Sequence, residues 1–271
     1  MSQSPAPVAS TPSTNAALGR LYLVPAPLDF GCDAQAPLLE VLPQSTILQA
    51  ARLNHWICEN AKSTRAYLKR IDALETLAVP VPAQQITELP REVHKKGDHG
   101  DKGAPVFDAR PLLSAALQGH DIGLVSEAGM PAVADPGSSI VRAAHDLGIA
   151  VMPLVGPVSL LLALAASGMN GQNFAFVGYL PQSGPERAQR MKELESIALK
   201  TGQTQVFIET PYRNAALWQA LTQTLQTNTR LAMAAGLTLE TSQIHSQPVK
   251  QWRQKAAPVD NRTPTVFLIG R

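Results

Sequence analysis

The sequence has little cysteine, little charge imbalance and no long uninterrupted apolar run. Its 271 residues include only two cysteines, Cys32 and Cys58, which form no close-spaced metal motif and no disulfide framework. We therefore expect reduced thiols in a cytoplasmic protein. The 23 Lys and Arg residues nearly balance the 21 Asp and Glu residues. Net charge alone thus gives no strong attraction to nucleic acid, although a local basic patch would still allow RNA binding.

Neither a membrane span nor a signal peptide is expected. The longest apolar run, residues 154–169, is interrupted by Gly and Pro and is shorter than the roughly 20 residues that span a bilayer. It is better explained as a buried strand end followed by a buried helix. Residues 1–19 are rich in Ser, Thr, Ala and Pro and lack a cationic start before an apolar core, so we expect a flexible tail.

The hydrophobic content of 45% is enough for a sizeable core. Short apolar runs bounded by turns predict strands, and amphipathic stretches predict helices between them. This alternation is typical of α/β domains, with parallel strands joined by right-handed crossovers. We expect an N-terminal α/β domain over 20–168 with an open, mostly parallel sheet, a linker near 167–173, and a C-terminal α/β domain over 174–271 with a mixed sheet.

The expected elements have approximate bounds. The expected strands are 21–24, 55–58, 122–125, 149–154, 174–177, 205–208, 230–234 and 265–269. The expected helices lie near 37–42, 63–73, 186–199 and 212–227. One more helix is predicted to begin with Asp135 as its N-cap and Pro136 at its first position, and to stop at Gly148.

Three turns rich in Gly, Pro or small residues follow predicted strands, at 25–31, 126–131 and 156–159. Loops at the carboxyl ends of parallel strands form the ligand crevice of an open α/β sheet. We therefore expect the three turns to build one small-molecule site, although each alone is also consistent with an ordinary turn. No G-x-G-x-x-G and no G-x-x-x-x-G-K-[ST] occurs, which disfavours nicotinamide and P-loop chemistry.

Five ordered motifs past residue 19 carry a family resemblance. They are L-Y-L-V-P-A-P-L-D, V-S-E-A-G-M-P-A-V-A-D-P-G, P-L-V-G-P-V-S, F-A-F-V-G-Y-L-P and F-I-E-T-P-Y-R. Together they resemble the tetrapyrrole (corrin/porphyrin) methylase superfamily. Within it, the sequence is most similar to the branch of ribosomal RNA small subunit methyltransferase I.

The resemblance implies a homodimeric methyltransferase with S-adenosylmethionine bound in a cleft between its two domains. It also implies ribosomal RNA, as a ribose 2′-hydroxyl, or the small ribosomal subunit as the methyl acceptor. By position, the expected cofactor-binding residues are Pro27, Ser126, Ala128, Gly129, Met130, Val133, Val158, Ser159, Glu209, Ala235, Gly236, Pro264 and Thr265.

The motifs also depart from the family. Met130 stands where tetrapyrrole enzymes carry an acid, a loss that the ribosomal branch shares. Residues 59–65 read E-N-A-K-S-T-R where that branch shows E-D-T-R, and residues 234–238 read A-A-G-L-T for A-R-E-L-T. Two alternatives therefore stay open: a methylase of a tetrapyrrole or other small molecule, and a cofactor-binding regulator without catalysis.

A hydroxyl acceptor must lose its proton, so a general base is expected near the cleft. We predict Asp29 or Glu59, because both follow predicted strands at the ligand edge, and Glu127 is a further candidate. The alternative is that these acids cap helices or pair with Arg52 or Arg65.

The polar segment 91–103 is expected to be an exposed loop. Its basic residues, Arg91, Lys95, Lys96 and Lys102, would contact phosphates if the acceptor is RNA, but an ordinary surface loop fits equally well. His94, His99, Asp98 and Asp101 match no zinc spacing, and we expect no metal site.

Overall fold

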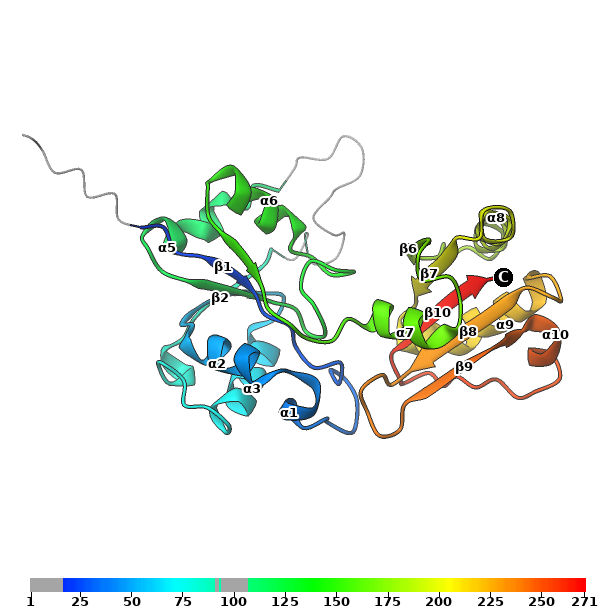
Figure 1. Cartoon of the computed structure of the whole chain (residues 1–271), viewed down its shortest axis with the longest axis horizontal. Helices are drawn as coiled ribbons and strands as arrows, with labels where there is room; N and C mark the ends of the chain where they lie inside the picture. The colour runs from blue at the N-terminus through cyan, green and yellow to red at the C-terminus, as the bar shows by residue number, and fades with distance from the viewer. Residues whose placement is uncertain (1–16, 91–92, 94–106) are drawn as a thin grey trace, which may run out of the picture.

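The computed structural model describes residues 17–90, 93 and 107–271, which form two five-stranded sheets side by side (Figure 1). Almost all of the expected N-terminal tail and of the expected loop at 91–103 lies outside the described residues. The basic cluster and the His and Asp residues of that loop lie there too, so their expected roles stay predictions.

The first sheet is parallel throughout and has the strand order β3-β2-β4-β1-β5. Its strands are β1 (Leu21–Leu23), β2 (His55–Cys58), β3 (Gln85–Glu88), β4 (Ile122–Val125) and β5 (Val151–Pro153). The turns that follow β4, β1 and β5 therefore emerge from neighbouring strands at one edge, as the sequence predicted.

Helices cover both faces of this sheet, because alternate strand residues point to opposite sides. Tyr22 and Trp56 pack toward one layer, formed by α1 (Leu38–Val41), α2 (Gln44–Arg52) and α3 (Ala61–Asp72). Leu21 and Ile57 pack toward the other layer, formed by the 3-10 helix η2 (Arg110–Leu113), α5 (Ser114–Leu117) and α6 (Ser138–Asp146). Burial on both faces explains the continuous apolar strands.

The second sheet is mixed and has the order β6-β7-β10-β8-β9. Only β6 and β7 pair in parallel, and the other neighbours are antiparallel. Its strands are β6 (Phe174–Tyr179), β7 (Thr204–Ile208), β8 (Arg230–Ala235), β9 (Gln243–Pro248) and β10 (Thr265–Gly270). The fold class expected from sequence, two α/β layers of which the first is parallel and the second mixed, is confirmed.

Helices also lie on both faces of the second sheet. One face carries α8 (Gly184–Thr201), α9 (Asn214–Thr224) and α10 (Val249–Trp252), packed around Phe207 and Phe267. The opposite face carries α7 (Ser159–Ser167), whose Leu160 and Leu164 pack against Val206 and Leu268. Helix α7 thus follows the last strand of the first sheet yet packs on the second (Figure 1). The division at residues 168–174 stays a prediction.

The predicted start of α6 was wrong. The helix begins at Ser138, and its N-cap is Gly137, with φ 137°. Asp135 therefore lies outside the helix, where its side chain is free to face the space between the two sheets. Several elements had no counterpart in the prediction: α2, β3, α5, β9, α10, η2 and the 3-10 helix η1 (Val81–Ala83).

Candidate functional site

A cleft of about 400 Å³ lies between the two sheets, and we call it the central cleft. The first half contributes all three predicted turns, through Leu28, residues 128–130 and residues 158–160. The second half contributes the ends of β7, β8 and β10 and the segments beside them. A cleft that draws on two sheets and three turns is typical of a small-molecule site.

Backbone hydrogen bonds join the first two turns into one wall. The amide of Ala26 donates to the carbonyl of Gly129 at 2.9 Å, and the amide of Gly129 donates back to Ala26 at 3.0 Å. Gly129 has φ 71°, and an added Cβ would lie 3.2 Å from the Leu28 side chain. Glycine therefore allows both the left-handed backbone and the close approach of the two turns.

The second turn continues through a strained segment. Ala132 and Ala134 adopt φ values of 63° and 66°, a conformation that costs a residue with a Cβ about 1–2 kcal/mol. Strain of this kind persists where surrounding structure enforces it, and it concentrates at ligand sites. Here it positions Val133 and Asp135, and both line the central cleft.

A buried carboxylate forms part of the opposite wall. Glu209 follows β7, and its Oε1 accepts from the Arg213 guanidinium and the Thr210 amide, each at 2.7 Å. Asn214 lies next in the chain and donates to the Thr263 carbonyl at 2.9 Å and the Thr265 hydroxyl at 3.2 Å. These bonds fix a polar edge on an otherwise apolar wall.

Among the acids that line the central cleft, Asp135 has the most strongly shifted pKa. Burial above all, and the negative charges of Glu59 and Glu127 in addition, raise its pKa to about 7, against a lowering effect of the nearby Ser126 hydroxyl. Its proton is therefore held far more tightly than that of an ordinary aspartate. A carboxyl that titrates near neutral pH is suited to general acid–base chemistry.

A tyrosine from the second half faces the same acids. Tyr179, at the end of β6, lines the central cleft. Burial raises the pKa of its hydroxyl, and the charges of Asp135 and Glu209 raise it too. The phenol therefore stays protonated and can donate a hydrogen bond into the cleft.

The structure brings most of the predicted cofactor residues together. Those that line the central cleft are Ala128, Gly129, Met130, Val133, Val158, Ser159, Glu209, Pro264 and Thr265. Pro27 and Ser126 line an adjoining hollow instead. Ala235 and Gly236 lie just after the cleft-lining Ala234 but line neither hollow. Cofactor contact by each of these residues stays a prediction.

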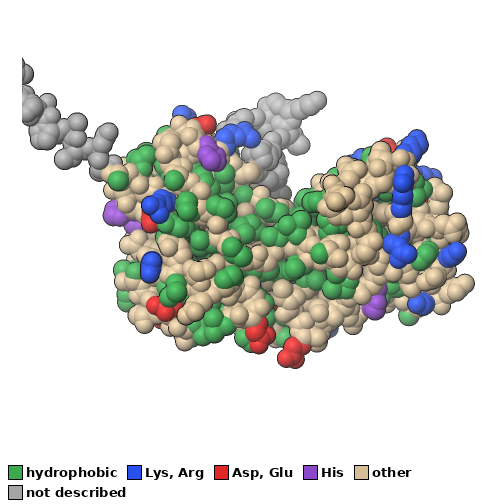
Figure 2. Space-filling view, viewed as in Figure 1, with side chains coloured by type: hydrophobic (Ala, Val, Ile, Leu, Met, Phe, Trp, Pro, Cys, Tyr) green, Lys and Arg blue, Asp and Glu red, His purple; other side chains and the backbone are tan. Residues whose placement is uncertain are grey.

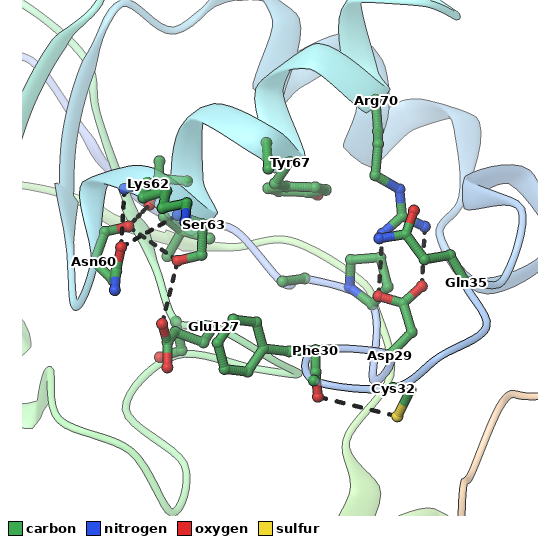
Figure 3. A pocket seen from close by; sticks show the side chains of 17 residues that line it. Asp29, Phe30, Cys32, Gln35, Asn60, Lys62, Ser63, Tyr67, Arg70 and Glu127 are labelled. Atoms are coloured by element: carbon green, nitrogen blue, oxygen red, sulfur yellow. Dashed lines mark hydrogen bonds and ion pairs between the residues drawn. The ribbon is translucent and has the colours of Figure 1, made fainter.

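The adjoining hollow, which we call the side pocket, measures about 470 Å³. It lies between the first turn, helix α3 and residues 125–127 (Figure 3). Asp29 lines it and is buried, and its two oxygens accept from Arg70 at 3.0 Å each. One of them also accepts from the Ala36 amide at 3.0 Å.

These contacts bear on the predicted bases. The carboxylate of Asp29 is occupied by a bidentate ion pair, with Arg70 rather than with Arg52 or Arg65. Glu59 follows β2 and lines neither hollow, and its charge raises the pKa of Asp135. A catalytic role for Asp29 or Glu59 stays a prediction. Sequence reasoning placed Asp135 at a helix start and so missed its place in the site. Its only sequence signal is that it belongs to the D-P-G at the end of the second motif.

The residues that the structure describes hold neither a metal-binding cluster nor a membrane-spanning helix. No group of three or more His, Cys, Asp or Glu side chains is placed to hold a metal ion. No helix within 17–90, 93 and 107–271 has the length and apolar character needed to cross a bilayer.

A family model described as Tetrapyrrole (Corrin/Porphyrin) Methylases matches residues 47–252. The chain belongs to the tetrapyrrole methylase family. The resemblance drawn from the five motifs is thereby confirmed, and the match extends across the turns at 126–131 and 156–159 and the Glu209 wall.

Similar curated proteins of this family are named ribosomal RNA small subunit methyltransferase I. The one from Vibrio cholerae is 32% identical over 57% of this chain and 52% of its own. The one from Escherichia coli is 28% identical over 85% and 70%, and the one from Mesorhizobium japonicum 32% over 80% and 63%. The chain thus spans less than two thirds of the length of two of these relatives, those from Vibrio cholerae and Mesorhizobium japonicum.

Solved structures of the family share the fold. The methyltransferase CobJ matches with a TM-score of 0.56 and 16% identity, over 93% of this chain and 94% of its own. A uroporphyrin-III-C-methyltransferase from Thermus thermophilus matches with a TM-score of 0.50 at the same identity and coverage. At this identity the likeness concerns the fold alone.

The central cleft fits S-adenosylmethionine in chemical character. Leu28, Met130, Ile208 and Leu237 offer apolar surface for the purine and the thioether arms. Glu209, buried on the same wall, is an acceptor for the donors of a ribose or an adenine. Because Gly129 carries no side chain, a ligand in the cleft can approach the backbone groups of the turn at 128–130 closely.

Proposed function

We propose that the chain transfers a methyl group from S-adenosylmethionine to a hydroxyl of small-subunit ribosomal RNA. The observation that carries the proposal is the joining of a cofactor-sized cleft and a carboxyl of pKa about 7 in one site of a tetrapyrrole methylase fold. The names of the curated relatives support RNA as the acceptor.

Residues on both walls would hold the cofactor. Gly129 and Met130 would meet its amino-acid end through backbone groups, and Glu209 would bind its adenosine. The cofactor supplies a methyl group already activated by its sulfonium: the acceptor oxygen bonds to the methyl carbon while the carbon–sulfur bond breaks, and that electron pair stays on sulfur. The protein's main task is to align the two reactants, which is worth up to roughly 7–11 kcal/mol.

Asp135 would act as the general base in this account. It takes the proton that the hydroxyl acceptor loses as the new bond forms, and its pKa of about 7 matches that task at neutral pH. Tyr179 would donate a hydrogen bond to the acceptor oxygen or to Asp135 from the opposite wall. This role for Asp135 replaces Asp29, whose oxygens are engaged by Arg70.

The two hollows offer few cations to a tetrapyrrole. A macrocycle bearing several carboxylates needs several cations to bind it. Among the described residues that line the central cleft, Arg262 is the one Lys or Arg. The described lining of the side pocket adds Lys62 and Arg70, and Arg70 is paired with Asp29.

A homodimer acting in the cytoplasm is part of the proposal. Three elements consecutive in the chain, β5, α7 and β6, expose large apolar side chains: Met152, Leu161, Leu162, Phe174 and Phe176. Both β5 and β6 are edge strands. Figure 2 shows hydrophobic side chains across the junction of the two halves. Exposed apolar surface on edge elements is typical of an interface, and a second copy is the expected partner.

The test is transfer of labelled methyl from S-adenosylmethionine to small ribosomal subunits from a strain that lacks this protein. We expect label in the RNA, and none when subunits from the parent strain are supplied, because their site is already modified. Transfer to a tetrapyrrole and not to RNA would support the alternative substrate. Cofactor binding without label in any cellular fraction would support the non-catalytic alternative.

A further inference from the structure

The side pocket is distinct from the central cleft, but the two adjoin. Phe30 and Gly31 line both, and residues 126–127 of the side pocket run directly into residues 128–130 of the cleft. At about 470 Å³ it lies within the usual range of ligand pockets. A molecule bound in the side pocket would therefore lie next to a cofactor in the cleft.

An exposed aromatic ring stands where the two hollows meet. Phe30 is 45% exposed, although its neighbour Asp29 is only 5% exposed. The bonds of Asp29 to Arg70 and Ala36 anchor the turn that presents the ring. Figure 3 shows the Phe30 ring beside Glu127, across the pocket from Tyr67 of α3. A planar apolar face on an anchored turn is a stacking surface for a nucleobase.

The polar groups of the side pocket suit a single nucleotide. Ser63 donates to Glu127 at 3.3 Å, and Asn60 caps α3 by accepting from the amides of Lys62 and Ser63. Gln35 adds an amide. Lys62 is exposed and forms no salt bridge with any residue that the structure describes, so its ammonium is available for a phosphate.

We propose that the side pocket holds the acceptor nucleotide of a single-stranded or unstacked RNA segment. The base stacks on Phe30, a neighbouring phosphate contacts Lys62, and the ribose faces the central cleft past Glu127. This proposal rests on the proposed function and names the site where its RNA is held. An unstacked nucleotide is required because a base can stack on Phe30 only after it leaves the stack of its own helix.

The experiment measures RNA binding separately from cofactor binding. The full chain, with saturating S-adenosylhomocysteine, is titrated into a fluorescein-labelled decaribonucleotide of mixed sequence, and anisotropy is followed at several salt concentrations. Calorimetry gives the S-adenosylhomocysteine affinity of each variant. Phe30→Ala and Lys62→Gln test the pocket, and Phe30→Tyr retains a stacking ring. Lys69→Gln is the matched control, since Lys69 is exposed on the same helix but lines neither hollow.

We expect Phe30→Ala to weaken RNA binding roughly 5- to 150-fold, as loss of one stacked base does, and Phe30→Tyr to restore it. Lys62→Gln should lower the slope of log affinity against log salt by about 0.7, and Lys69→Gln should leave the slope unchanged. S-adenosylhomocysteine affinity should be unaltered in Lys62→Gln.

Three results would overturn the proposal. The first is an RNA affinity that neither Phe30→Ala nor Lys62→Gln changes, and the second is a change of salt slope in Lys69→Gln equal to that in Lys62→Gln. The third is no RNA binding by a chain that binds S-adenosylhomocysteine. The last result would leave the cofactor site intact. A chain that binds no cofactor would contradict the proposed function instead. The RNA titration without cofactor, with the same variants, would then decide the side pocket by itself.

Discussion

At the scale of single residues, Asp135 decides how the acceptor is activated. Asp135→Asn keeps the size and an acceptor oxygen but cannot take a proton. We expect its kcat for methyl transfer to fall by about 10²–10⁴, the usual contribution of a general base, with unchanged S-adenosylhomocysteine affinity. Asp29→Asn is the comparison variant, and its kcat should fall only in proportion to the fraction of protein that is no longer folded. Full activity of Asp135→Asn would contradict the assignment.

The neighbours of Asp135 set the pH dependence. Because the base must be ionised, kcat/KM should rise with pH through about 7. Glu59→Gln removes a negative charge that raises the pKa of Asp135, so the rising limb should move to lower pH while turnover on the plateau persists. If the rising limb does not move, Glu59 does not set the pKa of Asp135. If turnover on the plateau is lost, Glu59 is the general base, as the sequence first predicted.

Asp135 also lowers the stability of the fold. Its pKa is near 7 when folded and 3.8 when unfolded, so the folded state holds the proton more tightly. Stability is therefore lost as pH rises from about 4 to 7. Urea unfolding should find Asp135→Asn more stable than the parent by roughly 2–4 kcal/mol near pH 8 and equal to it near pH 3.5. A gain that is the same at both pH values would refute the coupling.

At the scale of elements, the Asp29–Arg70 pair ties the first turn to α3. Asp29 is 5% exposed, so Arg70→Met leaves a buried carboxylate without its cation. We expect a loss of about 3 kcal/mol in the free energy of unfolding, the lower end for broken buried pairs because Arg70 is partly exposed. The double variant Asp29→Asn/Arg70→Met should recover part of that loss. Additive losses would show that the two residues act independently.

Sequence patterns predicted the strands with apolar runs and missed the two polar strands. The apolar runs of β1, β2 and β4 identified the core strands of the first sheet, because helices cover both sides. Strands β3 and β9 are polar in sequence and lie at sheet edges, each pairing with one neighbour only. Such strands depend on tertiary pairing rather than on a local pattern.

The candidate site could likewise be predicted from the sequence only in part. The three turns could be predicted because parallel strands bring their carboxyl ends to one edge. The place of Asp135 could not, because D-P-G is a favourable helix start locally. Its real surroundings are Ser126 and Glu127, earlier in the same connection, and Glu59, which follows another strand. The ion-pair partner of Asp29 could not be predicted from local sequence either, since Arg70 lies 41 positions away.

At the scale of the whole molecule, the apolar residues of β5, α7 and β6 predict association of two chains. Sedimentation equilibrium should give twice the monomer mass. Leu161→Asp should shift the measured mass to that of a monomer, because a charge would be buried at the interface. The substitution leaves the buried Leu164 on the same helix unchanged. A monomeric parent chain would remove the dimer from the account.

The central claim is that the cleft between the two sheets binds S-adenosylmethionine, and calorimetric titration of the folded chain with S-adenosylhomocysteine tests it most directly. Ala234→Trp serves as a control, since Ala234 is buried at the cleft and a bulky ring there would fill it. The account predicts one site per chain with micromolar affinity, lost in Ala234→Trp. No binding by the folded parent chain, or binding that Ala234→Trp leaves unchanged, would contradict it.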